Sequence, residues 1–394
     1  MTQDIHATRI DNLIQQHCPN GVKRVPLCDL LEYEQPGKYL VASTDYDDSF
    51  RTPVLTAGKT FVLGYTDEEH GIYGASPNSP VLIFDDFTTA FRWVDFPFKA
   101  KSSAMKFLTL KPSAGASLRY VFFAMQTIDY APQDHSRHWI GTYSKFTIPL
   151  PPLPVQEEIV RILDTFTQLE AELEAELEAR KQQYEHYRKM LLSSAAEVEW
   201  STLGEVSTRV SSGGTPRAGQ ASFYAGGTIP WLRTNEVRFN EIWDTEIKIT
   251  EDAVEQSSAK WIPENSVIVA ISGATAGRSA INKIPMTTNQ HCCNLEIDAA
   301  IAHYRYVFHW VGANYEQLKS LGRGVRSDLN SRIIKDFAIP VPSLAEQERI
   351  IAVLDQFDAL TNDLSVGLPA EIRARRQQYE FYRDRLLSFE EVQA

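Results

Sequence analysis

FTIPLPPLPVQEEIVRILDTFTQLEAELEAELEARKQQYEHYRKMLLS, residues 146–193, occurs twice in this chain. The second copy, residues 337–388, reads FAIPVPSLAEQERIIAVLDQFDALTNDLSVGLPAEIRARRQQYEFYRDRLLS. Setting Phe146 on Phe337 aligns 24 residues without a gap, of which 12 are identical. After four additional residues in the second copy, residues 181–193 match residues 376–388 at 9 of 13 positions. The chain is therefore internally duplicated.

Each copy has the apolar pattern of a long amphipathic helix. In the first copy, apolar residues recur at steps of three, four or seven, which keeps them on one helical face. They are Ile159, Ile162, Phe166, Leu169, Leu173, Leu177, Tyr184, Tyr187 and Leu191. Pro154 suits a first helical turn, and Ser343 with Glu346 fits a capping box at the second start. At about 1.5 Å per residue, a helix over residues 155–193 is roughly 58 Å long.

The two predicted helices differ in their middle sections. The first carries a tandem tetrapeptide, LEAE-LEAE-LEAR, from Leu169 to Arg180. Four residues exceed one helical turn by only about 40°, so one unit more or less changes the length while nearly keeping the face. The second copy instead carries Ser365-Val-Gly-Leu-Pro369. Because proline removes an N–H and clashes with the preceding turn, we expect a kink or break there.

A weaker repeat precedes each helix. Residues 22–30, VKRVPLCDL, resemble residues 198–206, VEWSTLGEV, at an offset of 176. Between these starts and the helices lie β-rich runs separated by turn residues, so both globular segments are predicted to be α+β. We expect strands at residues 38–42, 60–65, 80–84, 105–110, 228–232, 266–271 and 293–297, and helices at 2–17 and 303–320. The predicted order is an N-terminal helix or arm (1–21), a globular segment (22–150), a helical region (151–197), a globular segment (198–341) and a helical region (342–394).

The charge is distributed unevenly. The net charge of −12 divides into −2 for residues 1–154, −6 for 155–199, 0 for 200–343 and −4 for 344–394. The helical regions thus hold most of the negative excess, and the nearly neutral globular segments have room for local basic patches, which is what phosphate binding requires.

Length and composition indicate an ordinary globular protein. The chain has 394 residues, 43% of them hydrophobic and 23% charged, which allows two or three domains. No apolar run is long enough to span a bilayer and the N-terminus does not resemble a secretory signal, so we expect a cytoplasmic protein. The four cysteines, at positions 18, 28, 292 and 293, show no CxxC spacing, and we expect reduced thiols.

Motifs of common enzymes are absent from the sequence. There is no GxxxxGK[ST], GxGxxG, HExxH or GxSxG, and no Asn/Asp-Pro-Pro-aromatic run. Asp85-Asp86 with Lys99 and Lys101 loosely resembles a metal-dependent nuclease, but acidic pairs at strand ends are common. The histidines and cysteines near residues 135–138 and 291–293 do not supply four ligands at usual zinc spacings. We therefore predict no catalytic residue, no cofactor site and no metal site on this chain.

Basic, amide and aromatic residues alternate in turn-rich places on both globular segments. Arginine makes paired hydrogen bonds to guanine, Asn and Gln make them to adenine, and lysine contacts phosphate. Any one of these clusters can be an ordinary solvated loop, but together they favour nucleic acid. The predicted DNA-binding residues are Arg92, Lys99, Lys101, Lys106, His135, Arg137, Arg233, Asn235, Arg278, Asn289, Gln290, Arg323 and Arg326.

The ends of both helices, QQYEHYR and QQYEFYR, carry paired tyrosines. Two interpretations stay open together: the rings pack the two helices against each other, or they contact a partner subunit. The predicted residues of this helix-pair or partner interface are Ile159, Leu163, Phe166, Tyr184, Tyr187, Leu354, Phe357, Tyr379 and Tyr382.

The duplicated plan, the FxIPxPxL starts, the QQYExYRxxLLS ends and the LEAE units resemble specificity subunits of type I restriction-modification systems. The second globular segment also resembles that family's target recognition domains, with GGTP at 213–216 and PxTTNQ at 285–290, whereas the first matches less plainly. The resemblance implies two target recognition domains separated by two antiparallel conserved helices in a pseudo-twofold repeat, with the N-terminal helix beside the end of the second conserved helix.

The resemblance also implies the partners. Each domain reads one half of a bipartite, asymmetric double-stranded DNA site, and the helices fix the spacer and dock two adenine methyltransferase subunits. Those subunits bring S-adenosylmethionine, and restriction subunits bring ATP and Mg. Two alternatives remain: a specificity subunit whose methyltransferase lacks a restriction partner, and a structural adaptor whose globular segments bind protein.

Overall fold

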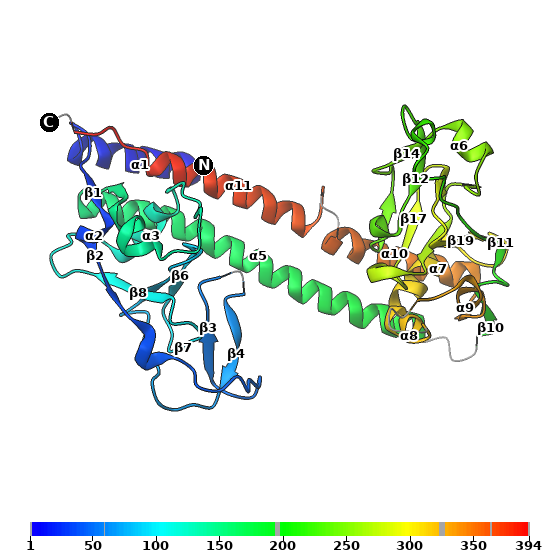
Figure 1. The fold of residues 1–394 in the computed structure, drawn as a ribbon, viewed down its shortest axis with the longest axis horizontal. Helices are drawn as coiled ribbons and strands as arrows, with labels where there is room; N and C mark the ends of the chain where they lie inside the picture. The colour runs from blue at the N-terminus through cyan, green and yellow to red at the C-terminus, as the bar shows by residue number, and fades with distance from the viewer. Residues whose placement is uncertain (1, 59, 194–197, 323–327, 363–364, 393–394) are drawn as a thin grey trace. The chain divides into compact units, whose positions relative to one another are not determined.

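The computed structural model describes residues 2–58, 60–193, 198–322, 328–362 and 365–392 (Figure 1). The chain forms two compact units. Unit 1 comprises Met1–Leu173 and Ile372–Ala394, and unit 2 comprises Glu174–Glu371. Each unit therefore contains one globular segment, the first half of one long helical region and the second half of the other. The architecture is α+β with an internal repeat.

Unit 1 is built from these elements: α1 (Thr2–His17), β1 (Arg24–Pro26), α2 (Leu27–Leu30), β2 (Leu31–Glu34), η1 (Pro36–Tyr39), β3 (Thr52–Leu55), β4 (Val62–Thr66), β5 (Val81–Asp85), β6 (Phe91–Val94), β7 (Lys99–Ala100), β8 (Met105–Leu110), α3 (Leu118–Met125), α4 (His138–Gly141), η2 (Tyr143–Lys145), β9 (Thr147–Pro149), the beginning of α5 (Leu153–Ser193) and nearly all of α11 (Leu368–Leu386).

Unit 2 follows with the remainder of α5 and with β10 (Trp200–Thr202), β11 (Ser207–Ser212), η3 (Ala221–Phe223), β12 (Ile229–Leu232), η4 (Thr234–Glu236), β13 (Asn240–Ile242), β14 (Lys248–Ile249), α6 (Glu251–Glu255), β15 (Trp261–Ile262), β16 (Val267–Ala270), η5 (Gly273–Thr275), β17 (Ser279–Asn282), β18 (Met286–Thr288), β19 (Cys292–Ile297), α7 (Tyr304–Ala313), α8 (Tyr315–Ser320), α9 (Ser331–Lys335), β20 (Ala338–Pro340) and α10 (Leu344–Asn362).

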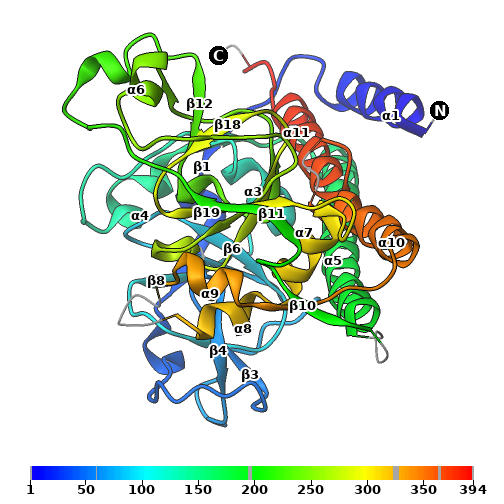
Figure 2. The same cartoon turned by 90° about the vertical axis from the view of Figure 1, so that its right-hand side faces the viewer.

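The two globular segments share one strand topology. The larger sheet of unit 1 has the order β2-β8-β5-β6, and that of unit 2 has β11-β19-β16-β17 with β13 added at the edge. The paired strands β11 and β19 of unit 2 are labelled side by side in Figure 2. The smaller sheets, β4-β3-β7 and β14-β12-β18-β15, each contain one parallel pair, β3 with β7 and β12 with β18. The internal repeat thus extends through the globular segments, beyond what their sequences indicate.

A short antiparallel ribbon closes each globular segment next to its helix. Val25 pairs with Ile148 in unit 1 and Ser201 with Ile339 in unit 2. The offsets between equivalent strands are the 176 and 191 residues of the two sequence repeats, so the weak repeat at residues 22–30 is confirmed as a structural one.

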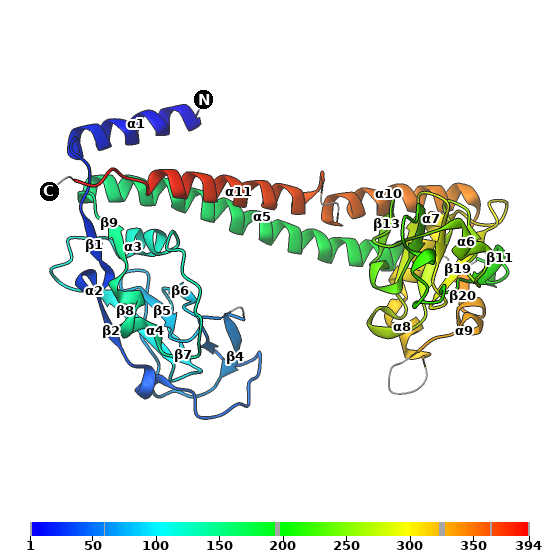
Figure 3. The ribbon, with the colours of Figure 1, turned by 45° about the horizontal axis from the view of Figure 1, so that its top comes forward.

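The segment that follows α1 is hydrogen-bonded to the C-terminal segment. The Val22 N–H donates to the Glu390 carbonyl over 2.8 Å, and the Val392 N–H donates to the Val22 carbonyl. Figure 3 shows the chain after α1 running beside the C-terminus. Ile10 of α1 is buried in the core of unit 1, whose members include Leu387 just after α11. The N-terminal helix therefore packs with the end of the second helical region, as the resemblance implied.

The long helical regions follow the prediction. Helix α5 has 41 residues and begins two residues before the predicted start. The second region is broken, because α10 ends at Asn362 and α11 begins at Leu368, with Pro369 in its first turn, where its missing N–H costs nothing. At the start of α10, the Ser343 hydroxyl caps Glu346 N–H over 3.3 Å, whereas the Glu346 carboxylate pairs with Arg349 instead of closing the box.

Two predicted elements were wrong. Residues 38–42 form no strand: Pro36 begins the 3₁₀ turn η1, and Leu40 makes only a single bridge, to Ala100. The helix predicted over 303–320 is two helices, because α7 ends at Ala313 and α8 begins at Tyr315. The Asn314 side chain between them donates to the Trp310 carbonyl over 2.9 Å, a local bond typical of helix ends.

Candidate nucleic-acid interface

In unit 2, loops from distant parts of the sequence meet at one edge of the smaller sheet. The parallel strands β12 and β18 pair Leu232 with Thr288 and end side by side. The Asn289 N–H donates to the Leu232 carbonyl over 2.9 Å, which holds the two following loops together. Arg233 and Asn235 follow one strand, and Asn289 and Gln290 follow the other.

The GGTP segment joins the same edge. Gly214 N–H donates to the Thr288 carbonyl over 2.9 Å, and the Trp231 indole N–H donates to the Gly214 carbonyl over 2.9 Å. A side chain on Gly213 would overlap the Thr288 carbonyl, so glycine is required where the two backbones approach. The Thr215 hydroxyl then donates to the Gln290 side-chain oxygen.

Two further loops complete this edge. The Thr275 hydroxyl of η5 donates to the Thr234 carbonyl over 2.9 Å, which ties the loop after β16, with Arg278 at its end, to the loop after β12. The Asp328 carboxylate accepts from Gly273 N–H, and Leu329 N–H donates to the Ile271 carbonyl over 2.8 Å. We call residues 213–216, 233–236, 272–278, 288–291 and 328–330 the loop edge of unit 2.

The predicted side chains on this edge differ in their freedom to bind a ligand. Asn235 and Gln290 are exposed. Arg233 already pairs with Glu246 and lies near Glu236, and Asn289 is buried with its side-chain oxygen accepting from His291 N–H. Arg323 and Arg326 lie outside the described residues. Asn235 is therefore better placed than Arg233 to contact an added molecule, and Gln290 is exposed although its side chain bonds to Thr215 and to the His291 ring (3.1 Å).

Unit 1 has an equivalent edge built by equivalent main-chain bonds. Lys101 N–H donates to the Leu55 carbonyl over 3.0 Å, at the end of the parallel pair β3 and β7. The Arg92 guanidinium reaches the Gly58 carbonyl over 3.4 Å, and His138 N–H donates to the Asp86 carbonyl over 2.9 Å. We call residues 56–58, 86–90, 101–104 and 134–138 the loop edge of unit 1.

His135 and Arg137 lie exposed on a loop that Asp86 anchors. The buried Asp86 carboxylate accepts from Trp139 N–H over 2.7 Å and pairs with the Lys106 ammonium over 3.0 Å. Because Lys106 is 1% exposed, it supports the loop from within and is not available for a surface contact. We therefore leave Lys106 out of the candidate interface.

Lys99 is left out of the candidate interface for the same reason. It is 3% exposed, pairs with Glu68 over 2.7 Å and donates to the His70 carbonyl over 2.6 Å. Lys101 differs, because it is only half-buried and its ammonium rests at the Tyr46 hydroxyl, 3.1 Å away. Arg92, Lys101, His135 and Arg137 remain as the candidate interface residues of unit 1.

The nuclease-like constellation is used structurally. The Asp85 carboxylate accepts from Phe87 N–H and Thr88 N–H, closing the turn after β5, while Asp86 is buried against Lys106. Among the described residues, no group of three or more His, Cys, Asp or Glu side chains is arranged to hold a metal ion.

The four cysteines are free thiols, and burial raises the pKa of Cys293 to about 11. Within the described residues, no helix is long and apolar enough to cross a membrane.

Each globular segment is joined to its helix by a buried glutamine. The Gln156 side-chain oxygen accepts from Ser117 N–H over 2.9 Å, and its amide donates to the Pro151 carbonyl over 2.7 Å. Gln347 makes the equivalent bonds to His303 N–H (2.8 Å) and the Pro342 carbonyl (2.9 Å). The same hydrogen bonds therefore join the globular segment to its helix in both units, and we call this connection the joint.

Three of the four tyrosines of the helix ends stack on an aromatic residue of the other helical region within their unit, and Tyr379 contacts the globular segment. In unit 1, Tyr382 stacks on Phe166 with ring centroids 5.3 Å apart, and Tyr379 donates to the Gln126 side chain. In unit 2, both Tyr184 and Tyr187 stack on Phe357. The remaining predicted interface residues are fully buried in the unit cores: Ile159, Leu163 and Leu354.

The joints differ in one ionic feature. In unit 1, Asp164 pairs with Arg119 over 2.7 Å, and no histidine of the described residues joins this pair. In unit 2, Asp355 pairs with Arg305 over 2.6 Å and also with the buried His309 ring over 2.7 Å. Burial by itself would raise the pKa of Asp355, but the hydrogen bonds from His309 and Arg305 hold that pKa below its usual value.

Comparison with known proteins identifies the repeat. The family model "Type I restriction modification DNA specificity domain" matches residues 19–179 and 196–374, one copy for each half of the chain. The specificity subunit of the type I restriction enzymes EcoR124I and EcoR124II from Escherichia coli is 46% identical over 389 residues, covering 93% of this chain and 94% of that protein. A putative type I specificity subunit from Haemophilus influenzae is 28% identical, covering 69% and 72%.

The solved type I restriction-modification S subunit from M. genitalium has the same fold, with a TM-score of 0.59, 14% identity and coverage of 93% of this chain and 96% of that one. With two family domains and a full-length relative at this identity, the chain belongs to the type I restriction-modification DNA specificity family. It is a specificity subunit of a type I restriction-modification system, a non-catalytic component of such systems.

Proposed function

We propose that each globular segment is a target recognition domain that reads one half of a bipartite, asymmetric double-stranded DNA site. The observation that carries this proposal is the loop edge, which both units build from the same main-chain bonds but fill with different side chains. Two different half-sites require recognition surfaces that share a main-chain framework and differ in their side chains. The boundaries we propose are 22–150 and 198–341 for the domains, with 1–21 as an arm and 151–197 and 342–394 as helical regions.

The chemistry of the edges supports direct contact with DNA. On unit 2, the exposed amides of Asn235 and Gln290 suit paired hydrogen bonds to adenine in the major groove. On unit 1, Arg92, Lys101 and Arg137 supply cations for guanine or phosphate. Arg233, Arg278, Asn289 and His135 stay proposed contacts of the same edges, and Arg323 and Arg326, outside the described residues, stay proposed DNA contacts.

The helical regions are proposed to set the unread spacer between half-sites and to dock two methyltransferase subunits. The modification would be adenine N6 methylation, with S-adenosylmethionine on the methyltransferase and ATP with Mg on the restriction subunits. The acidic net charge of these regions disfavours phosphate contact and leaves them for protein partners. The complex would act in the bacterial or archaeal cytoplasm.

Two alternatives lead to different outcomes. A specificity subunit whose methyltransferase lacks a restriction partner gives the same methylation without cleavage. A protein-binding adaptor gives binding that salt leaves unchanged, whereas phosphate contacts weaken steeply as salt rises.

Modification-sensitive long-read sequencing of the host genome, with this gene present and deleted, tests the proposal. We expect a split motif carrying N6-methyladenine in both halves that disappears on deletion. If methylation does not change, we measure the binding of the chain, co-purified with its methyltransferase, to host DNA fragments between about 50 and 200 mM salt. Affinity that falls with salt indicates a silent system, and affinity that does not fall with salt indicates an adaptor and overturns the proposal.

A further inference from the structure

The repeat retains residues that packing does not explain. Of the 21 identical positions in the two aligned blocks, most are buried in the unit cores or take part in the joints, as Gln156 and Gln347 do. Six positions are identical and exposed in both copies. They are Leu153 and Leu344, Glu157 and Glu348, Leu169 and Leu360, Gln182 and Gln377, Gln183 and Gln378, and Glu185 and Glu380.

Each unit holds one full set of six, because each takes the first half of one helical region and the second half of the other. The leucines are notable, since Leu153 and Leu344 are 45% and 40% exposed and Leu169 and Leu360 are 39% and 37% exposed. Of the 37 aligned residues 16 have diverged, whereas these leucines are retained although each has more than a third of its surface exposed. Because the same six residues are retained at equivalent places in both units, each set is expected to bind the same kind of partner.

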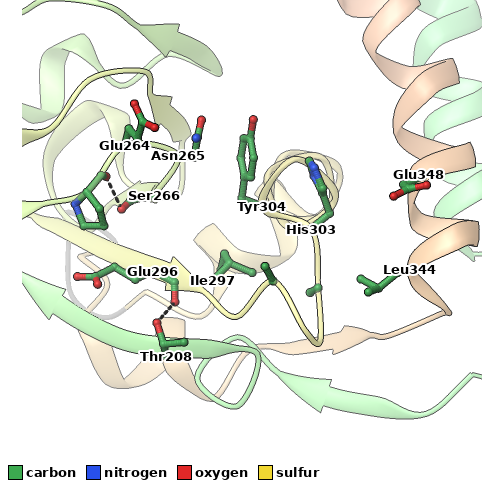
Figure 4. A pocket seen from close by; sticks show the side chains of 13 residues that line it. Thr208, Glu264, Asn265, Ser266, Glu296, Ile297, His303, Tyr304, Leu344 and Glu348 are labelled. Carbon is green, nitrogen blue, oxygen red and sulfur yellow. Dashed lines mark hydrogen bonds between the residues drawn. The ribbon is translucent and has the colours of Figure 1, made fainter.

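In unit 2 one pair of this set lines a cavity. Leu344 and Glu348 are one helical turn apart on α10 and project toward His303 and Tyr304, at the start of α7 (Figure 4). The cavity has a volume of about 430 Å³ and is also lined by Glu264, in the loop between β15 and β16, and by Thr208 and Glu296 of the large sheet. An apolar side chain next to a carboxylate in a cavity suits a partner surface that presents an apolar and a basic side chain.

The charge of the cavity restricts which partner side chains can bind there. Its three lining carboxylates belong to Glu264, Glu296 and Glu348, and among the described residues only that of Glu296 forms a salt bridge, with Arg209 at 3.2 Å. One further cation, Lys283, lies at the same wall, where its ammonium donates to Asn265 (2.7 Å) and Tyr304 (3.3 Å), so the carboxylates still outnumber the cations. Burial and the Arg305 charge lower the pKa of His303, which favours the neutral ring. The surface is therefore complementary to a basic partner residue and repels an acidic one.

We infer that Leu153 with Glu157 and Leu344 with Glu348 are twin anchor points, one in each unit, for two copies of the methyltransferase subunit. Each copy would place an apolar side chain on the leucine and a lysine or arginine on the glutamate. This inference rests on the proposed function, because it takes the methyltransferase as the partner, but it does not depend on how DNA is read.

The test uses the full chain co-expressed with its methyltransferase and measures stoichiometry by native mass spectrometry without DNA. We compare wild type with Leu344→Ala/Glu348→Lys, Leu153→Ala/Glu157→Lys and the four-fold variant. Each double variant should weaken docking on the altered unit by roughly 100-fold, because an apolar contact and a charge pair are both lost. The expected complexes are 2:1 for wild type, 1:1 for either double variant and free chain for the four-fold variant.

Thr165→Lys and Gln356→Lys serve as matched controls, since these exposed positions correspond in the repeat but differ in residue. They should keep the 2:1 complex. A 2:1 complex in the four-fold variant overturns the inference, as does a wild-type dimer of this chain that the variants abolish. A wild-type chain that recovers no methyltransferase instead counts against the proposed function.

Discussion

Replacing the buried Gln347 with leucine should loosen unit 2 and leave unit 1 unchanged. The glutamine side chain accepts from His303 N–H (2.8 Å) and donates to the carbonyls of Pro342 (2.9 Å) and Ile301 (3.2 Å). Leucine has a similar volume but satisfies none of these groups. At about 1 kcal/mol for each neutral hydrogen bond, the variant should lose roughly 3 kcal/mol of the free energy of opening.

Native-state hydrogen exchange followed by mass spectrometry measures this loss locally. A change of that size accelerates exchange through opening by about 100-fold, because each 1.4 kcal/mol is a factor of ten. Peptides of unit 2 should show the acceleration in Gln347→Leu, and peptides of unit 1 should show it in Gln156→Leu, whose equivalent bonds join Ser117 and Pro151.

Gln356→Leu is the control, because this exposed glutamine on the same helix should change stability by less than about 0.5 kcal/mol. The reasoning is refuted if Gln347→Leu shifts exchange no more than the control, or if it accelerates both units equally. Either result would mean that the buried glutamines do not hold each recognition domain to its own helix.

Three further predictions concern protonation, thiols and length. The His303 ring caps α7 by accepting from Arg305 N–H (3.2 Å), and its pKa lies below the usual 6.5, so its stabilisation is complete above pH 6.5 and is lost as pH falls. Thermal melts from pH 7 to 5 should therefore fall less for His303→Ser, the residue that unit 1 has at this place. The buried Cys292 and Cys293, whose pKa values burial raises, should react with a thiol reagent only after unfolding, and fast labelling in the native chain would contradict this. Deleting one LEAE unit should shorten the methylated motif's spacer by one or two base pairs, roughly the 6 Å rise of four helical residues, and leave both half-sites unchanged; an unaltered spacer would refute it.

The sequence predicted the helical architecture well because its signal is local and repeated. The period of apolar residues located α5 to within two residues, and the Ser365–Pro369 segment located the break before α11. The globular segments were harder to compare. Their shared strand order depends on main-chain pairing, such as β12 with β18, which leaves no mark in residue identities.

The candidate interface was predicted in part. Gly213 and Gln290 were found through short motifs, and the structure brings them to one edge although they lie 77 positions apart. Lys99 and Lys106 were assigned to DNA because a basic side chain looks the same in a sequence whether it is exposed or buried. Their partners, Glu68 and Asp86, stand 31 and 20 residues away, and only the fold shows that they meet.

The main-chain bonds that build the loop edges also affect how this protein can evolve. Lys101 and Asn289 are held by their own N–H groups to carbonyls of the neighbouring strand, and the His138 N–H is bound to the carbonyl of Asp86, just after β5. Such bonds form with almost any residue type, so mutation can exchange the side chains while the scaffold keeps its place. If the loop edges read DNA as proposed, a few point mutations in these side chains change the target sequence while the fold is kept, so new specificities arise without loss of stability.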